Sequence, residues 1–127
     1  MNQPRPKRGE FVPAYLALLV GDELAQRVDY MPDMKYGDST LAHKYSKVRN
    51  YVEVNQAAVR EMHRQVGDLV LDTNGVALRG LLVRHLVLPG GIGGTEKVLA
   101  FLAKEVSRQT YLNLMDQYRP CWHAGQY

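Results

Sequence analysis

The stretch GLLVRHLVLPGGIGG, from Gly80 to Gly94, carries the strongest structural signal in this sequence. Its first half is a nearly continuous apolar run, which is typical of a strand buried on both faces of a parallel sheet. Arg84 and His85 interrupt this run, and an unpartnered guanidinium in a core is so costly that Arg84 needs an anion nearby. Pro89 ends the strand and four glycines follow within five residues. Folds of the α/β class usually bind their ligand where such a strand opens into a loop.

The composition predicts one globular domain. The chain has 127 residues, of which 46% are hydrophobic and 23% charged. The net charge of +3 is too small and too scattered to favour a nucleic-acid partner. The single cysteine, Cys121, permits no disulfide within the chain, which fits a reducing compartment. The apolar run Ala14–Val20 is too short to span a bilayer and is followed by Gly-Asp-Glu instead of a signal-peptide cleavage site, so we expect a cytoplasmic protein with no membrane partner.

The first third of the chain predicts an amino-terminal region and one edge strand. Residues 1–27 read as a basic arm followed by a helix over Val12–Arg27, and residues 28–127 read as the main domain. Val28–Tyr36 alternates weakly, as a strand does, and Pro32 places that strand at a sheet edge or beside a bulge. A turn follows, from which Ser39 is expected to cap a short helix ending near Tyr45.

A long helix and a hairpin follow. Asn50–Val66 carries an apolar stripe of Val54, Ala58 and Met62, and Gly67 is expected to end this helix. The Asp-Thr-Asn-Gly stretch at 72–75 lies between two short apolar runs, which predicts a tight β-hairpin.

One more helix and one more strand complete the pattern. Thr95 is expected to cap a helix that turns Val98, Leu99, Leu102 and Val106 inward, and Tyr111–Met115 is the last strand. Strands that alternate with helices predict a parallel α/β sheet. Three main strands are fewer than a full (β/α) barrel contains, since that fold takes about 250 residues.

Polar side chains collect near the carboxyl ends of these three strands. They are Asp33 and Lys35 on the first, Arg84 on the second, and Asn113 on the third, with Gln117 and Tyr118 following. Because side chains two residues apart share a face, Asp33, Lys35, Arg84 and Asn113 can converge on one pocket, while His85 points to the opposite face. Lys35 and Arg84 would attract a carboxylate or phosphate. The alternative interpretation is that Asp33 pairs with Lys35 at the surface and Arg84 pairs with a nearby acid.

Two further patterns give weaker signals. The glycines at 90–94 precede a helix and can either cradle a phosphate or form a tight strand-to-helix turn, and they match neither GxGxxG nor a P-loop. The four histidines and Cys121 show no metal-ligand spacing, and no stretch has the signature of a nucleophilic catalytic site.

Four stretches together resemble the carboxyl-terminal half of radical S-adenosylmethionine proteins, and most closely the proteins related to pyruvate formate-lyase activating enzyme. They are VDYMPDMKYGD, REMHRQVGDLVLDTNGVALRGLLVRHLVLPGG, the glycine-rich loop and YLNLMDQYRPC, which run from about Val28 to Cys121. The resemblance implies an incomplete portion of a partial (β/α) barrel, related to the TIM barrel, with parallel strands.

The resemblance also implies a cofactor and a set of residues that bind it. Asp33 and Lys35 match the DLK-like motif that contacts the ribose and methionyl parts of S-adenosylmethionine, and Arg84 matches the arginine that meets its carboxylate. Gln117 and Tyr118 match the region near the adenine. In the family, a 4Fe–4S cluster held by a CxxxCxxC loop cleaves this cofactor to a radical, which in activating enzymes takes a hydrogen from a glycine of a partner protein.

This chain lacks the CxxxCxxC motif, and residues 1–27 do not resemble the cluster-bearing half of the family. The first hypothesis is therefore a truncated or split member that is inactive until another polypeptide supplies the amino-terminal half. The second is a non-enzymatic binding or assembly module that pairs with a partner or with itself through an exposed sheet edge. The third is a small-molecule binder that keeps the pocket without redox chemistry.

Overall fold

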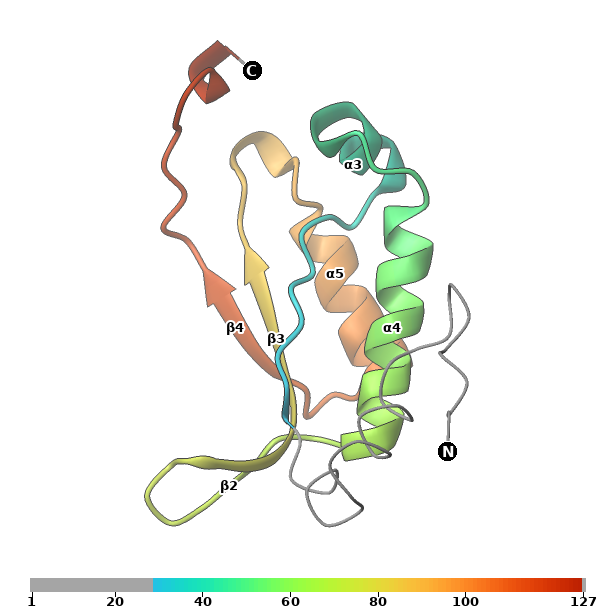
Figure 1. Ribbon diagram of the computed structural model, residues 1–127, viewed down its shortest axis with the longest axis vertical. Helices are drawn as coiled ribbons and strands as arrows, with labels where there is room; N and C mark the ends of the chain where they lie inside the picture. The colour runs from blue at the N-terminus through green and yellow to red at the C-terminus, as the bar shows by residue number, and fades with distance from the viewer. Residues whose placement is uncertain (1–28, 127) are drawn as a thin grey trace, which may run out of the picture.

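The computed structural model describes residues 29–126 of the chain. The arm and the helix that we predicted within residues 1–27 lie outside the described residues. In chain order the elements are β1 (Asp29–Tyr30), α3 (Ser39–Ser46), α4 (Tyr51–Val66), β2 (Val70–Leu71), β3 (Ala77–Leu86), the 3₁₀ turn η1 (Pro89–Gly91), α5 (Thr95–Phe101), its π-helical continuation η2 (Leu102–Val106), β4 (Tyr111–Met115) and the 3₁₀ turn η3 (Ala124–Gln126). Figure 1 shows the strands along one side of the molecule and α4 and α5 along the other. Within residues 29–126, every helix is too short or too polar to cross a bilayer.

The sheet is built around β3, the longest strand. β1 and β4 both pair with β3 in parallel, and β2 pairs with it in antiparallel fashion to form the hairpin. These pairings confirm the predicted parallel α/β sheet and the predicted hairpin. Among the described residues the sheet stays open and does not close into a barrel.

β1 is shorter than the strand predicted over Val28–Tyr36, but its position at an edge of the described sheet is confirmed. Regular pairing ends at Tyr30, before Pro32, which has no backbone N–H to donate. The chain nevertheless stays beside β3. The Arg84 N–H donates to the Pro32 carbonyl at 2.9 Å, and the Met34 N–H donates to the Arg84 carbonyl at 2.9 Å.

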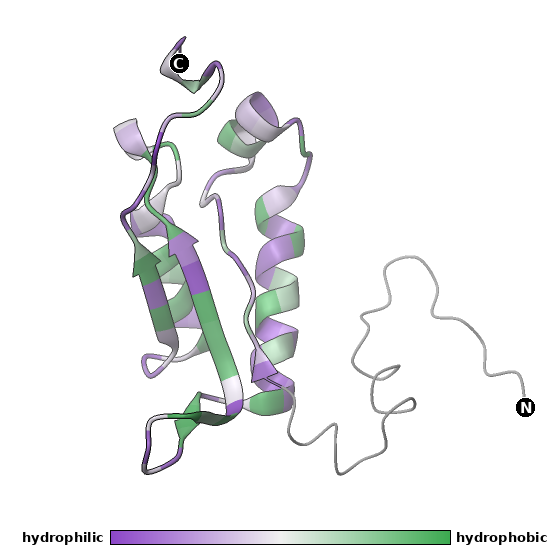
Figure 2. Cartoon of the chain, turned by 60° about the vertical axis from the view of Figure 1, so that its left-hand side comes forward, coloured by the Kyte–Doolittle hydropathy of each residue, from purple (hydrophilic) through white to green (hydrophobic). Residues whose placement is uncertain are grey.

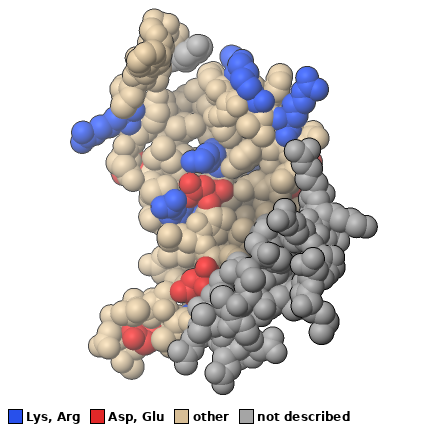
Figure 3. Space-filling model, viewed as in Figure 1, with Lys and Arg blue, Asp and Glu red and all other residues tan. Residues whose placement is uncertain are grey.

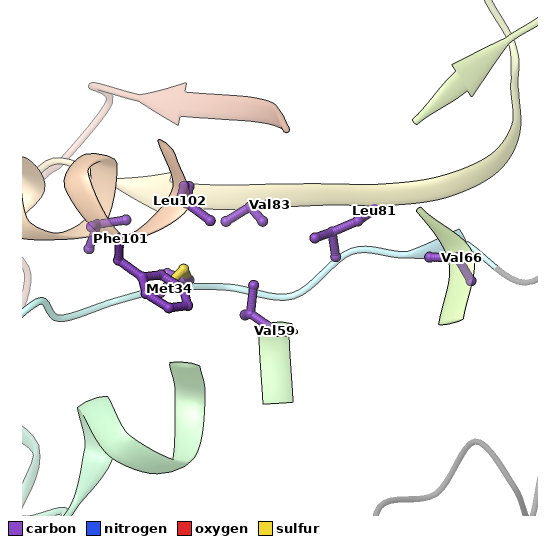
Figure 4. Packing of buried hydrophobic residues seen from close by; sticks show 8 residues of the cluster. Met34, Val59, Val66, Leu81, Val83, Phe101 and Leu102 are labelled. Carbon is purple, nitrogen blue, oxygen red and sulfur yellow. The ribbon is translucent and has the colours of Figure 1, made fainter. Parts of the chain in front are cut away.

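The two faces of β3 differ, which corrects the prediction of a strand buried on both faces. Leu81, Val83 and His85 are buried beneath the helices, whereas Leu82, Arg84 and Leu86 on the other face are only partly covered by the described residues. Figure 2 shows the helices on one side of the sheet. Figure 4 shows how the buried side packs. The core cluster consists of Met34, Val59, Val66, Leu81, Val83, Val98, Phe101 and Leu102.

Helix α4 ends at Val66 as predicted and begins at Tyr51, one residue after the predicted start, but it presents a different stripe to the core. Val59 and Val66 are buried and Met62 packs partly against them, whereas Val54 is 66% exposed. The face of α4 that turns inward is therefore rotated by part of a turn from the predicted stripe of Val54, Ala58 and Met62. The helix is mostly polar, so the sheet that it covers selects which face turns inward.

Helix α5 also turns differently from the prediction. Val98 and Leu102 are buried as predicted, but Phe101 takes the inward position expected for Leu99, which is 40% exposed. Thr95 is the first helical residue rather than the cap, and Gly94 occupies the cap position without a side-chain hydrogen bond. The Thr95 hydroxyl contacts His85 instead, at 2.8 Å from Nε2.

Helix α3 is capped by Asp38 rather than by Ser39. The Asp38 carboxylate accepts hydrogen bonds from the backbone N–H groups of Thr40 and Leu41. The Ser39 hydroxyl instead donates to Glu53 at 2.9 Å and accepts from the Val52 N–H at 3.1 Å, so it joins α3 to α4.

Gly37 and Gly94 bring the loop after β1 against the loop after β3. The Gly37 N–H donates to the Gly93 carbonyl at 2.9 Å. A Cβ atom on Gly37 would lie 2.5 Å from the Gly94 carbonyl oxygen and 2.8 Å from Lys97 Cβ. Only a residue without a side chain permits this approach, and it holds the carboxyl ends of two neighbouring strands together.

Replacing Gly37 with alanine should lower the free energy of unfolding by about 1–3 kcal/mol, the usual cost of forcing atoms into a filled site. Urea unfolding followed by circular dichroism measures this change. Gly125→Ala is the matched control, because a Cβ there meets no atom within 4 Å. Equal stability of the two variants would show that the loops do not approach as described.

Candidate functional site

The carboxyl ends of the parallel strands bring the predicted charged residues together. Arg84 Nε donates to Asp33 Oδ1 at 2.7 Å, and Lys35 Nζ lies 3.3 Å from Asp33 Oδ2. The strand register places Arg84 between Asp33 on one side and Asn113 of β4 on the other, so all three project from the same open face. Figure 3 shows basic and acidic side chains side by side in the middle of one face of the molecule.

Both ion pairs that the alternative interpretation predicted are present. Asp33 supplies the anion that Arg84 needs, and it also pairs with Lys35. Arg84 and Lys35 carry two positive charges and Asp33 carries one negative charge, so the three side chains together have a net charge of +1. Within the described residues, the guanidinium of Arg84 donates through Nε alone, so Nη1 and Nη2 remain able to bind a further anion.

Two side chains of helix α4 form hydrogen bonds to the backbone at Asp33 and Lys35. The side-chain amide of Asn55 donates to the Asp33 carbonyl at 3.1 Å, and the Tyr51 hydroxyl accepts from the Lys35 N–H at 2.8 Å. Asn55 and Tyr51 therefore hold the strand that carries both charged side chains. Neither role has a local signal in the sequence, because the two residues lie on a helix that follows in the chain.

The charges around Asp33 change its acidity. Partial burial acts to raise the pKa of Asp33, but the hydrogen bonds from Arg84 and Lys35 and their positive charges outweigh that effect. The pKa of Asp33 therefore lies below its ordinary value, and the carboxylate is ionised at neutral pH.

A pocket of about 550 Å³ lies beyond the carboxyl ends of the strands. It is mostly apolar, and its lining residues are Tyr36, Tyr45, Leu88, Pro89, Ile92, Tyr118, Pro120, Ala124 and Gly125. Tyr36 follows Lys35 directly in the chain, and its ring packs edge-on against Tyr51 with centroids 5.5 Å apart. The pocket thus lies where parallel α/β sheets commonly bind ligands.

The structure brings some of the predicted residues to this region and leaves others aside. Asp33, Lys35, Arg84 and Asn113 share the open face, and Tyr118 lines the pocket. Gln117 is exposed and is not among the lining residues. Tyr36 and Tyr45 were missed. The position of Tyr36, directly after Asp33 and Lys35, could have indicated that it lies near the site. Tyr45 had no such signal, because it reaches the pocket only through the packing of α3.

The glycine-rich loop forms a tight strand-to-helix turn, the second of the two interpretations of this pattern. The Ile92 N–H donates to the Pro89 carbonyl and the Gly94 N–H donates to the Gly91 carbonyl. The loop therefore uses part of its backbone to close on itself, and the helix after it is only seven residues long. These features do not support a phosphate cradle.

His85 lies on the opposite face from Arg84, as predicted, and is fully buried. Its Nδ1 lies at hydrogen-bond distance from the Met34 carbonyl, which can only accept, so Nδ1 carries the proton. Its Nε2 then accepts from the Thr95 hydroxyl at 2.8 Å. His85 is a structural residue that ties β3 to the chain after β1 and to the start of α5.

The other histidines and the cysteine form no site within the described residues. No group of three metal-ligating side chains occurs there, and Cys121 is exposed. His63 and Ser107 both contact the carboxylate of Asp68, at 2.8 and 3.0 Å. Because the aspartate lies between them, the histidine cannot activate the serine hydroxyl, and the group acts as a structural link.

Comparisons with known proteins identify one similar chain. The sequence is 29% identical over 99 residues to an uncharacterized protein, MJ0674, of Methanocaldococcus jannaschii. The matched region covers 77% of this chain and 25% of that protein, so this chain spans about a quarter of the length of its relative. No family model matches the sequence, and no solved structure matches it.

Replacing Arg84 with methionine should raise the pKa of Asp33, because the variant removes its shorter hydrogen bond and one positive charge. The folded-state pKa of Asp33 is below the unfolded value of about 3.9. This carboxylate therefore stabilises the fold above that pH, and the contribution is lost as the pH falls through the folded-state pKa. NMR titration of the Asp33 carboxyl carbon measures the change.

Lys97→Met is the control for this titration. Lys97 pairs with Asp38 at 2.9 Å, and its hydrogen bond is the main cause that lowers the pKa of Asp38. This variant should raise the pKa of Asp38 and leave that of Asp33 unchanged. If Arg84→Met leaves the Asp33 titration unchanged, the ion pair does not form in solution.

Proposed function

We propose that this chain is the carboxyl-terminal part of a radical S-adenosylmethionine protein of the activating-enzyme type, and that it binds S-adenosylmethionine at the carboxyl ends of β1, β3 and β4. The observation that carries the proposal is the meeting of Asp33, Lys35 and Arg84 on one face, and a mostly apolar pocket lined by tyrosines lies beyond the strand ends. A zwitterionic ligand with a flat ring needs both features, a cluster of opposite charges and an apolar compartment.

Each residue has a task that suits its chemistry. Arg84 donates through Nη1 and Nη2 to the ligand carboxylate, since only Nε is used by Asp33 within the described residues. Asp33 accepts from the ribose hydroxyls or the ammonium group, and Lys35 keeps Asp33 ionised. Asn113, beside Arg84 on β4, adds an amide that can both donate and accept. The rings of Tyr36 and Tyr118 flank the space for the adenine.

The one-sided cover of the sheet supports the barrel part of the proposal. In a (β/α) barrel the helices lie outside and the opposite face of every strand points inward. Here α4 and α5 pack on the face of Leu81 and Val83, while Leu82, Arg84 and Leu86 face the other way. We therefore infer that the described sheet is an incomplete barrel wall whose inner face carries the site.

The residues of this chain do not fit a 4Fe–4S cluster. The cluster needs three cysteine thiolates in this family, and the 127 residues contain only Cys121, which is exposed. S-adenosylmethionine supplies a 5′-deoxyadenosyl radical when an electron reaches its sulfonium, and no side chain here provides that electron. These residues would therefore bind and orient the ligand, and the cluster would have to be held outside these 127 residues. The complete assembly would determine which glycine or other group receives the radical.

Isothermal titration of the chain with S-adenosylmethionine tests the proposal. Saturable heat is expected at up to millimolar ligand, and Arg84→Met should weaken binding about tenfold or more, as the loss of a charge-assisted hydrogen bond does. Arg64→Met is the control with unchanged affinity, since Arg64 pairs with Glu61 on the surface of α4. Absence of heat from the unaltered chain would remove the binding function.

A second candidate function, an assembly module without catalysis, is favoured by the edge strand β4. β4 pairs with β3 on one side, and no described residue pairs with its other side. Tyr111 and Leu114 on this strand are about half exposed. An unpaired edge with apolar side chains is able to add a strand from another chain.

Sedimentation equilibrium over a range of concentrations tests this second function. Self-association is expected, and Leu114→Lys should weaken it, because charged side chains on an edge oppose strand addition. Leu99→Lys on the outer side of α5 is the matched control and should have no effect. A monomer at every concentration would count against self-assembly through this edge.

A further inference from the structure

Basic side chains gather on two walls of the pocket at the strand ends, although the net charge of the whole chain is only +3. One wall contains Tyr45 of α3, and residues 43–50 around it include three basic residues and no acidic one. Another wall belongs to the carboxyl-terminal tail, where residues 117–126 include Arg119 and no acidic residue. Figure 3 shows basic side chains at this end of the molecule, on the side of α3 and on the side of the tail.

These basic side chains have no acidic partner among residues 29–126. They are Lys44, Lys47, Arg49 and Arg119, and all four residues are exposed. The ion pairs of the described residues involve other cations. Lys44 Nζ lies 5.1 Å from the centre of the Tyr45 ring, and Lys47 Nζ donates to the Lys44 carbonyl at 3.0 Å. A group of like charges without counter-charges attracts an anionic partner.

An exposed aromatic side chain accompanies the cations. Trp122 is 93% exposed, and it lies in the tail between the pocket-lining residues Pro120 and Ala124. Its ring meets the ring of His123 with centroids 5.1 Å apart and planes at 85° to one another, so the two rings do not stack. The indole is therefore open to a flat partner, and covering it would remove a large apolar surface from water.

We propose that this end of the domain binds a single-stranded nucleic acid, whose phosphates contact the four cations and whose bases stack on Trp122. Each nucleotide brings one negative charge and one flat ring, which are the two features that this surface offers. An acidic peptide would use the cations alone, and a double strand keeps its bases stacked inside. The inference goes beyond the proposed function, because neither the four cations nor Trp122 has a part in binding S-adenosylmethionine.

Fluorescence of the unaltered chain tests the proposal, because Trp122 is its only tryptophan. A single-stranded oligothymidylate of about twelve nucleotides, a common site size, is added at low salt and without S-adenosylmethionine. Stacking of a base on the indole should quench the emission to a saturable end point. Four phosphate contacts give a slope of about −3 in a plot of log K against log salt, so a fourfold rise in salt should weaken binding about fiftyfold.

Two kinds of variant separate the charges from the ring, and the fluorescence anisotropy of a labelled oligothymidylate follows both. The double variant Arg49→Gln, Arg119→Gln removes one cation from each wall and should halve the salt slope. Trp122→Ala should weaken binding about tenfold and leave the slope unchanged, because it removes stacking and no charge. Lys104→Gln is the matched control and should change neither, since exposed Lys104 lies on η2, which leads into the opposite end of β4.

Unchanged emission at low salt would overturn the proposal, and so would a Lys104→Gln variant that lowers the slope as much as the double variant does. Equal affinity for the duplex of the same length would exclude a single-stranded partner. Equal affinity for an oligoglutamate would point to an acidic peptide, and equal affinity for thymidine monophosphate would point to a free nucleotide. A chain that binds the oligothymidylate but gives no heat with S-adenosylmethionine would lose the proposed function and keep this one.

Discussion

The ion pair between Asp33 and Arg84 fixes the path of the chain after β1 and, through it, the layout of the site. Two backbone hydrogen bonds flank it, and the ion pair of 2.7 Å lies above them. Together they hold the chain after β1 beside β3, even though Pro32 prevents regular strand pairing there. The same contact gives Arg84 the anion that a charged residue in the central strand requires.

From this contact the arrangement of the site follows. Once Asp33 lies beside Arg84, Tyr36 comes to the end of the sheet, where Leu88 and Tyr118 complete a pocket. The close approach of Gly37 and Gly94 and the ion pair of Lys97 with Asp38 join the two loops at this end. On the other face, buried His85 contacts the Met34 carbonyl and the Thr95 hydroxyl and so links the same segments. The site is therefore held from both sides of the sheet.

Much of the fold was predictable because its signals are local. Asn-Gly marks the hairpin turn, Gly67 ends α4, and alternation places Arg84 and His85 on opposite faces. The errors concern choices that local sequence leaves open. Val54 and Leu99 were placed inside because a helix with several apolar residues can turn more than one face inward, and the sheet made the selection. Ser39 and Thr95 were assigned as caps, but their hydroxyls bond to neighbouring elements instead.

The amino-acid pattern alone predicts which side chains of a strand share a face and which lie at its end, because side chains alternate along a strand. It thereby predicted that Asp33, Lys35, Arg84 and Asn113 can converge if their strands are parallel neighbours. The packing of distant segments makes Asp33 the partner of Arg84, brings Tyr36 and Tyr45 to Tyr118 in one pocket, and leaves one face of β3 partly open. These contacts join residues far apart in the chain, and their geometry depends on how the helices and loops pack around the sheet.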